Sequence, residues 1–230
     1  MAGGGYIQMK NLTVVKHPLV VDLVTKLRDA GTNSENFRKY TKIITYYLMY
    51  EALNGVSTRN KKVSTQTEGI YMGKEVVETI KFFAVLREGV GMLIAPMELL
   101  STAEFDLIGV KRNDADPFNA PATMYFDSFK NIGNHISHVF LMDQMFATGG
   151  TMLIILDSLF NKNHFKGRVD IISVIAAKIG VERVLKQYPQ VKITCAGYDT
   201  KLTNKGYIYP GLGDAADRYF NTLKKENHTR

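Results

Sequence analysis

The chain is poor in cysteine, proline and long apolar runs, and each shortage argues against a class of protein. Its 230 residues contain one cysteine, Cys195, and six prolines. A lone cysteine cannot form a disulfide within the chain, which argues against a disulfide-built secreted scaffold and favours a cytoplasmic location. No stretch approaches the roughly 18 consecutive apolar residues of a membrane-spanning helix. Residues 1–10 also lack the apolar core of a signal peptide, so we expect a loose extension there.

The composition that remains is that of a globular protein with a basic surface. Hydrophobic residues make up 45% of the sequence, and 230 residues suffice for one α/β domain or two small ones. The formal net charge is +7, with the basic residues dispersed apart from short clusters at 59–62 and 224–225. This charge suits a polyanionic partner, and a phosphorylated small substrate accounts for its sign as well as a nucleic acid does.

The most informative stretch of the sequence is residues 139–160. An apolar run from Val139 to Met142 predicts a buried parallel strand, and Asp143 follows it directly. Apolar residues then recur at helical spacing from Met152 onward. The loop between strand and helix consists of small and hydroxyl-bearing residues, which let the backbone curl round a ligand: Ala147, Thr148, Gly149, Gly150 and Thr151.

This loop has the features of a phosphate site, because the free amides of a helix's first turn should point into it. A plain turn between a strand and a helix fits the spacing equally well. Asp143 favours the binding site, since a carboxylate beside a bound phosphate must face another group, such as sugar hydroxyls or a metal ion. Phosphate and sugar together suggest a ribose phosphate.

Two other predicted strands end in arginine. Residues 82–86 form an apolar run followed by Arg87, and residues 105–110 form another that leads to Arg112. In open α/β sheets the carboxyl ends of the strands form the ligand-binding edge, where a guanidinium can hold a pyrophosphate with two parallel hydrogen bonds. Taken singly, each arginine is better explained as a solvated surface charge.

Apolar periodicity predicts further helices and strands around this edge. Residues 56–80 alternate Ser and Thr with apolar residues, which predicts one or two solvent-facing strands with a turn. The polar stretch 113–134 is too long for a tight turn and predicts an arm over the site. His17 and Cys195 are interpreted as structural, one at a helix start and one in a core strand. The other predicted elements are helices over 19–27, 34–52 (capped by Ser34), 92–100 and 181–188, and strands over 169–176 and 191–195.

Glycine and proline are concentrated near the end of the sequence, in GYIYPGLGDAADRYFNT at 206–222. Such a segment forms a bent, extended chain whose exposed amides and carbonyls can pair with the edge of a flat heterocycle. We expect it to form a hood over the strand ends, and a pyrimidine such as uracil presents the required edge.

These runs resemble the signatures of one enzyme family. DQMFATGGT at 143–151 resembles DPMLATGGS of uracil phosphoribosyltransferases, and residues 206–222 resemble GYIxPGLGDAGDRxFGT of the same family. HPLV at 17–20, LREG at 86–89 and GVKR at 109–112 also resemble family segments, so the resemblance covers roughly residues 17–222. The departures from the family pattern are Glu88, Gln144, Phe146, Thr151, Ala216 and Asn221.

Three of these departures carry structural expectations. Glu88 places a negative charge beside Arg87, so we expect its side chain to point away from the site. Ala216 replaces a glycine and therefore requires a negative φ. Asn221 replaces another glycine, and asparagine tolerates a left-handed backbone better than most residues do.

The resemblance implies roles for the matching residues. In the family the first run holds the ribose and 5-phosphate of phosphoribosyl pyrophosphate (PRPP), the two arginines contact PRPP and the hood recognises uracil. Asp143, Arg87 and Asp214 would form the catalytic group. Carried over by position, the PRPP-binding residues are Arg87, Arg112, Asp143, Gln144, Met145, Phe146, Ala147, Thr148, Gly149, Gly150, Thr151 and Asp214, and the uracil-binding residues are Ile208, Gly213, Asp214 and Ala215.

The same resemblance implies a fold and a reaction. The fold would be a single type I phosphoribosyltransferase domain over residues 1–230, a mostly parallel sheet flanked by helices with a C-terminal hood and a β-arm. The reaction would transfer ribose 5-phosphate from PRPP to uracil, giving uridine monophosphate (UMP) and pyrophosphate in pyrimidine salvage. Magnesium would be carried by PRPP, with no metal held directly by the protein. A homodimer or homotetramer is expected, and a GTP activator is compatible with the family although no motif reveals one.

The alternative from a different class is an RNA-binding regulator of pyrimidine genes that keeps this fold and has weak activity. Its signature would be a basic surface away from the site and salt-dependent binding of RNA. The dispersed Lys and Arg residues do not favour it, so we expect neither a nucleic-acid nor a membrane partner.

Overall fold

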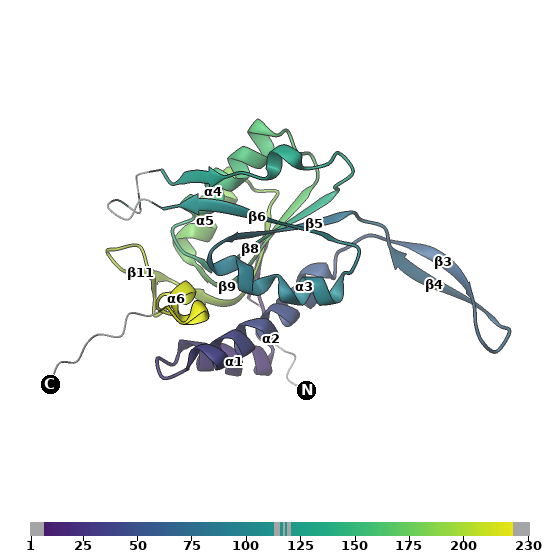
Figure 1. The fold of residues 1–230 in the computed structure, drawn as a ribbon, viewed down its shortest axis with the longest axis horizontal. Coiled ribbons are helices and arrows are strands. Elements are labelled where there is room, and N and C mark those ends of the chain that lie inside the picture. Colours follow the sequence, from purple (N-terminus) through teal and green to yellow (C-terminus); the bar gives the residue numbers. More distant parts are fainter. Residues whose placement is uncertain (1–6, 113–115, 117, 119–120, 223–230) are drawn as a thin grey trace.

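The computed structural model describes residues 7–112, 116, 118 and 121–222, and its centre is an eight-stranded sheet (Figure 1). The strand order is β1-β2-β10-β9-β8-β5-β6-β7. Neighbours from β2 to β6 run parallel, whereas β1 and β7 pair antiparallel at the two edges. This confirms the predicted mostly parallel sheet. Its strands are β1 (Ile7–Met9), β2 (Leu12–Val14), β5 (Ile80–Leu86), β6 (Glu104–Lys111), β7 (Thr123–Phe126), β8 (His138–Phe146), β9 (Arg168–Ala177) and β10 (Lys192–Asp199).

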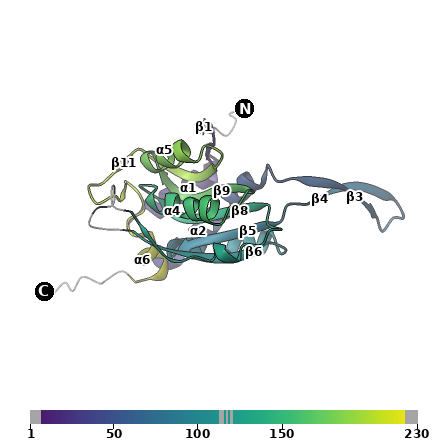
Figure 2. The same ribbon diagram turned by 90° about the horizontal axis from the view of Figure 1, so that it is seen from above.

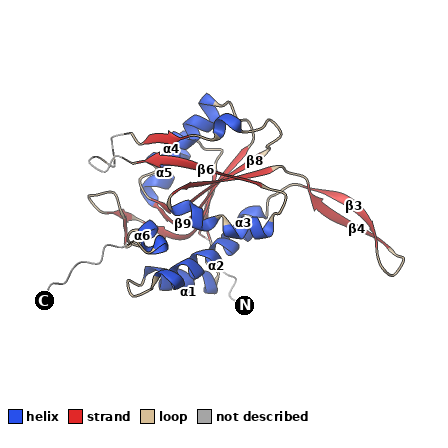
Figure 3. Ribbon diagram, viewed as in Figure 1, coloured by secondary structure: helices blue, strands red, loops and turns tan. Residues whose placement is uncertain are grey.

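Helices cover both faces of the sheet (Figures 1 and 3). One face carries α1 (Pro18–Arg28), α2 (Ser34–Leu53), α3 (Ile94–Leu99) and α6 (Ala215–Phe220), and the other carries α4 (Gly150–Asp157) and α5 (Lys178–Gln187). Two 3-10 turns, η1 (Glu88–Met92) and η2 (Phe129–Asn131), and a π-helical turn, η3 (Ser158–Lys162), complete the helical elements. No helix within the described ranges combines the length and apolar content needed to cross a bilayer.

The alternation of side chains along each strand feeds two separate cores. In β8, Phe140 and Met142 pack on the α1 and α2 side, whereas Val139 and Leu141 pack on the α4 and α5 side. All four are fully buried, which is why the strand reads as a continuous apolar run. Cys195 of β10 is buried in the second core, as predicted.

A two-stranded hairpin projects from the body beside the amino end of β5 (Figure 2). It consists of β3 (Thr58–Ser64) and β4 (Ile70–Val76), which pair antiparallel, and it confirms the solvent-facing strands predicted for 56–80. Exposed apolar side chains include Ile70, Tyr71 and Met72. An isolated hairpin of this kind has little stability of its own in water.

The chain after β10 forms the hood at the opposite, carboxyl edge of the sheet. β11 (Lys201–Leu202) and β12 (Ile208–Tyr209) pair antiparallel, and α6 follows. The Tyr209–Pro210 peptide is cis. Asn221 ends α6 with φ 59°, the left-handed conformation that the sequence suggested it could adopt, and Ala216 lies inside the helix as its side chain requires.

Several boundaries differ from the sequence-based predictions. Residues 7–9 of the expected loose extension form β1, because they can pair with β2. The cap of α2 is Asn33, whose side chain accepts from the Asn36 amide, and not Ser34. In the stretch 113–134, residues 123–126 form an edge strand on β6 in place of a long arm, while residues 113–115, 117 and 119–120 lie outside the described ranges. The basic pair at 224–225 also lies outside them.

Candidate active site

A cavity of about 560 Å³ lies between the carboxyl ends of the strands and the hood. Its walls come from the end of β5 with η1, the end of β6, β8 with its following loop, and the hood; β7 adds Tyr125. Another cavity, of about 630 Å³, lies at the opposite edge against β2, β9 and β10. Because open parallel sheets bind ligands at the carboxyl ends of their strands, we take the first cavity as the candidate site.

The strand β8 reaches further into this site than its sequence suggested. The apolar run ends at Met142, where pairing with β5 ends as well, but β8 stays paired with β9 as far as Phe146. Asp143 was expected after the strand and instead lies inside it, just past the point where β5 diverges. The residue lines the cavity there.

Asp143 has an unusual electrostatic environment for a carboxylate. The residue is 7% exposed, and Oδ1 accepts a hydrogen bond from the Met145 amide at 3.3 Å. Burial raises the pKa of Asp143 to about 8, and the negative charge of Glu88 acts in the same direction. Two carboxylates therefore share one cavity wall, and the buried one binds its proton more tightly than an exposed aspartate does.

The orientation expected for Glu88 is wrong. Its side chain lines the cavity and does not point away from it. The reason is the close packing of η1 against β8. The side-chain amide of Gln144 donates to the Glu88 carbonyl at 2.7 Å. A Cβ on Gly89 would lie 2.2 Å from the Met142 carbonyl oxygen. With the turn's backbone held on that side, the Glu88 side chain faces the cavity.

Strand alternation divides the run 143–151 into two groups. Side chains of Asp143, Met145, Ala147 and Thr151 line the cavity. Gln144 is buried and its side chain donates to the Glu88 carbonyl, and Phe146 is buried in the core on the side of α4 and α5. Thr148, Gly149 and Gly150 are not among the lining residues.

The loop that follows β8 is held in a tight curve against α5. Gly149 has φ 81°, and a Cβ there would lie 2.9 Å from the Gly180 carbonyl oxygen. A Cβ on Gly180 would in turn lie 2.3 Å from the Ala147 carbonyl oxygen, and Arg183 donates to the Thr148 carbonyl at 2.9 Å. The loop therefore has a fixed shape before α4 begins, and the first-turn amides of α4 provide donors for an anion.

The two predicted arginines lie on the cavity wall and both reach toward the hood. Arg87 is 56% exposed and forms an ion pair of 3.1 Å with Asp217 of α6. The guanidinium of Arg112 lies over the ring of Tyr207, 5.0 Å from its centroid, and its Nη1 is 3.5 Å from the Gly206 carbonyl oxygen. The positive charges at the ends of β5 and β6 are thus brought together with the hood.

All four hood residues predicted to bind a base line the same cavity: Ile208, Gly213, Asp214 and Ala215. Asp214 also caps α6, with Oδ1 accepting from the Asp217 amide at 2.9 Å. Gly211 and Gly213 have φ values of 59° and 72°, which place the bends of the hood where side chains other than glycine are strained.

Four further polar side chains that line the site or touch its residues were not predicted: Lys111, Tyr125, Asp217 and Tyr207. Lys111 stands beside Arg112, so the strand-end argument already applied to it. Tyr125 reaches the cavity only because β7 pairs with β6, and no local pattern signals that pairing. Asp217 and Tyr207 matter through their contacts with arginines that are distant in sequence.

The chain is similar to known proteins over nearly its whole length. The model of the uracil phosphoribosyltransferase family matches residues 14–222. A uracil phosphoribosyltransferase of Campylobacter concisus is 33% identical over 215 residues, covering 94% of this chain and 100% of the relative. One from Thermosipho melanesiensis is 36% identical over 214 residues, covering 92% of this chain and 99% of the relative.

Among solved structures, a protein from Aquifex aeolicus is similar with a TM-score of 0.80 and 30% identity, covering 91% of this chain and 97% of that one. The adenine phosphoribosyltransferase of Leishmania donovani has a TM-score of 0.54 at 15% identity, covering 88% and 90%, and is similar in fold alone. With a family model and relatives that extend over nearly the whole sequence, the chain belongs to the uracil phosphoribosyltransferase family.

Proposed function

We propose that this cavity transfers ribose 5-phosphate from PRPP to uracil, giving UMP and pyrophosphate. The observation that carries the proposal is the meeting of the loop after β8 and the hood in one cavity, with Ala147 and Thr151 on one wall and Ile208 to Ala215 on another. The first wall provides donors for a sugar phosphate and the second provides backbone groups for a base.

The ribose would lie over Asp143. In the PRPP complex its carboxylate would face the ribose hydroxyls and the positive charge that develops on the sugar. That charge and the nearby arginines favour the ionised carboxylate. The 5-phosphate would accept hydrogen bonds from the backbone of the loop between Ala147 and Thr151, where the curve held by Gly149 and Gly180 is already formed.

Arg87 and Arg112 would hold the pyrophosphate. In the transfer, the bond from ribose C1′ to the pyrophosphate oxygen breaks, the bond from C1′ to uracil N1 forms, and the N1 proton leaves for the pyrophosphate or water. Among the described residues that line the cavity, the acid–base groups nearest to neutral strength are carboxylates and no histidine is present, so positioning and electrostatic stabilisation would provide most of the rate enhancement. Uracil would be recognised through the backbone around Ile208 and Gly213, with Asp214 meeting both substrates.

We further propose that PRPP carries magnesium into the cavity. Within the described ranges, no group of three or more His, Cys, Asp or Glu side chains is placed to hold a metal ion. Asp143 and Glu88 could contribute carboxylate oxygens, and oxygens of PRPP would provide the remaining ligands. Bound there, the ion would neutralise charge on the departing pyrophosphate.

The expected homo-oligomer and cytoplasmic location also remain proposals. The exposed apolar side chains on β3 and β4, Ile70, Tyr71 and Met72 among them, support association, since a projecting hairpin gains stability when a second copy covers it. Light scattering after size exclusion would measure the mass of the assembly. The RNA-binding alternative gains no support from the relatives named above, and RNA retention that falls steeply with salt would be needed to revive it.

The test of the proposed activity is incubation with PRPP, magnesium and one free base at a time, with chromatography of the nucleotide product. UMP should appear with uracil, and purines should give no nucleotide. A purine nucleotide as the main product, or no nucleotide with any base, would contradict the assignment.

A further inference from the structure

The bend of the hood is held from below by side chains of α1 and β10. Arg28, the last residue of α1, forms two parallel hydrogen bonds to Asp199 at the end of β10, each of 2.8 Å. The same guanidinium donates to the Gly211 carbonyl at 3.0 Å, and the Gly211 amide donates to Asp199 at 3.1 Å. Both polar backbone groups of one hood residue are thus bound by a single Arg–Asp pair.

Gly211 is the residue where this hold matters most. It has φ 59°, and a Cβ would lie 2.2 Å from the Ile208 carbonyl oxygen, so the chain folds back on itself here. The turn lies between Ile208 and Gly213, which line the cavity on either side of it. A shift of Gly211 would therefore move both lining residues.

A second guanidinium holds the next residue. Arg218 of α6 donates to the Leu212 carbonyl at 2.8 Å and to the Leu27 carbonyl at 2.6 Å, and it lies over the ring of Phe37. It is also 2.6 Å from the Asp29 carbonyl oxygen. Three backbone groups of the hood are thereby tied to the ends of α1 and β10: the Gly211 amide, the Gly211 carbonyl and the Leu212 carbonyl.

The amino edge of the sheet contains a similar Arg–Asp pair, Arg168 and Asp170, which does not line the candidate site. Arg168 bonds Asp170 and donates to the Gly55 carbonyl at 2.9 Å. Its side-chain exposure is 27% for the arginine and 4% for the aspartate, against 24% and 8% for Arg28 and Asp199. The two pairs have the same chemistry, and they differ in the glycine whose carbonyl they hold.

We propose that Arg28 and Asp199 are positioning residues for the base: they fix the Gly211 turn so that Ile208 and Gly213 meet the pyrimidine at the correct distance. This inference rests on the proposed function, because it assigns the pair to the base half of that reaction. Neither residue touches the cavity itself. Fixing a loop before binding removes the entropy that the base would otherwise spend in ordering it.

The variant Arg28→Lys tests the proposal, because a lysine keeps the charge opposite Asp199 but cannot bond both carboxylate oxygens and the Gly211 carbonyl. We expect the KM for uracil to rise on the order of tenfold, the effect of one lost charge-assisted hydrogen bond. The kcat and the KM for PRPP should stay close to those of the wild type. Arg168→Lys is the matched control and should leave all three constants unchanged.

Amide hydrogen exchange provides a second readout that does not depend on catalysis. In Arg28→Lys, exchange should accelerate over 208–213 and not over 143–151, whereas Arg168→Lys should accelerate neither. If Arg28→Lys does not fold, Asp199→Asn takes its place in both measurements.

The outcomes separate the two proposals. An unchanged KM for uracil with unchanged exchange over 208–213, or equal rises in both KM values, would overturn the positioning role. Absence of UMP formation by the wild type would overturn the proposed function alone, and accelerated exchange over 208–213 in Arg28→Lys would still support the hold on the hood.

Discussion

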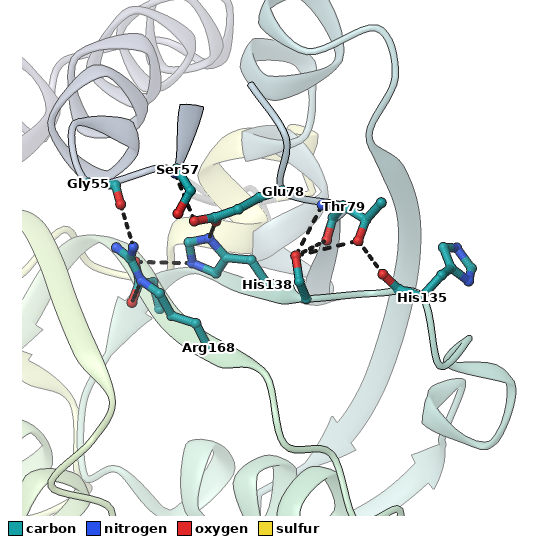
Figure 4. A network of polar contacts seen from close by, with 9 residues as sticks. Gly55, Ser57, Glu78, Thr79, His135, His138 and Arg168 are labelled. Atoms are coloured by element: carbon teal, nitrogen blue, oxygen red, sulfur yellow. Dashed lines mark hydrogen bonds and ion pairs between the residues drawn. The ribbon is translucent and has the colours of Figure 1, made fainter. Parts of the chain in front are cut away.

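The two edges of the central sheet use the same kinds of side chain in opposite ways. At the amino edge, His138 is fully buried between two carboxylates: Nδ1 lies 2.7 Å from Glu78, and Nε2 lies 3.2 Å from Asp170 without hydrogen-bond geometry (Figure 4). Arg168 completes the network by bonding Asp170 and Gly55. The charged groups of this network face one another.

At the carboxyl edge the charged groups face a cavity. Asp143 and Glu88 lie on one wall of it, and burial, together with the negative charge of Glu88, raises the pKa of Asp143. Arg87, by contrast, pairs with Asp217 through an exposed contact. The comparison teaches that residue type does not distinguish a structural network from a site; what distinguishes them is whether the protein itself provides the partners.

The largest effect is expected when one charged partner is removed from the network at the amino edge. Asp170→Asn should lower the free energy of unfolding by roughly 3 kcal/mol, because it leaves Arg168 and His138 without the charge that both approach. Urea unfolding measures the loss, and the KM values for uracil and PRPP should not change. A variant of normal stability with impaired catalysis would show that this edge takes part in the reaction.

Arg87→Ala removes a group whose intended partner is the substrate. We expect a fall in kcat/KM on the order of 10²-fold, the usual effect of losing one donor to developing charge. Stability should hardly change, because the exposed pair with Asp217 contributes little. The exposed Lys42, which pairs with Glu98 at 2.8 Å, gives the control Lys42→Ala. Equal activity of Arg87→Ala and the wild type in UMP formation would refute the assignment.

Asp143→Asn should change how the stability of the protein depends on pH. The pKa of Asp143 is raised from 3.8 to about 8, so the folded protein binds this proton more tightly than the unfolded chain does. The stability that this provides is complete below the unfolded pKa and is lost as pH rises through the folded one. Asparagine does not titrate, so the variant does not lose this stability. Its free energy of unfolding should exceed that of the wild type by ~1 kcal/mol or more at about pH 8, since one pKa unit corresponds to about 1.36 kcal/mol.

Urea unfolding at several pH values, without added substrate, measures this difference in the free energy of unfolding. The difference should grow between the two pKa values and stay constant above the higher one. Parallel stability curves for variant and wild type across the range would mean that the pKa of Asp143 is not raised.

The smallest expected effect belongs to Asp217→Asn. The exposed pair of Asp217 with Arg87 must open before the guanidinium can bind pyrophosphate. Weakening it should lower the KM for PRPP by about two- to threefold, as an exposed ion pair is worth a few tenths of a kcal/mol. Thr222→Val, which removes a hydroxyl that also bonds Asp217, is the control. A raised KM for PRPP would mean that Asp217 helps to position Arg87 for the substrate.

Much of this site could be predicted from local sequence. The apolar run before Asp143, the small residues after it and the glycines of the hood are short-range signals, and they indicated a loop and a bend at the places where the structure has them. The end of β8 could not be located, because its last residues pair with β9 alone and the apolar pattern ends earlier.

The features of the site that could not be predicted from the sequence depend on contacts between residues distant in the chain. The orientation of Glu88 follows from the packing of η1 on β8, and the bonds between Arg28, Asp199 and Gly211 join three separate elements. Periodicity and propensity describe neighbours along the chain, so a side chain whose role is set by a distant backbone gives no signal of its own.

The hold of α1 on the hood also has a consequence for how the molecule assembles. Arg28 is 171 residues from Asp199 and 183 from Gly211. The phosphate loop, residues 147–151 between β8 and α4, is instead held by Gly180 and Arg183 of α5, which lie much closer to it in the sequence. Closing the larger loop costs more chain entropy, and it requires residues made late in synthesis to return to the first helix. A nascent chain that stops short of residue 199 has every residue of the phosphate loop but lacks those that read a base, so selectivity for its pyrimidine is acquired last.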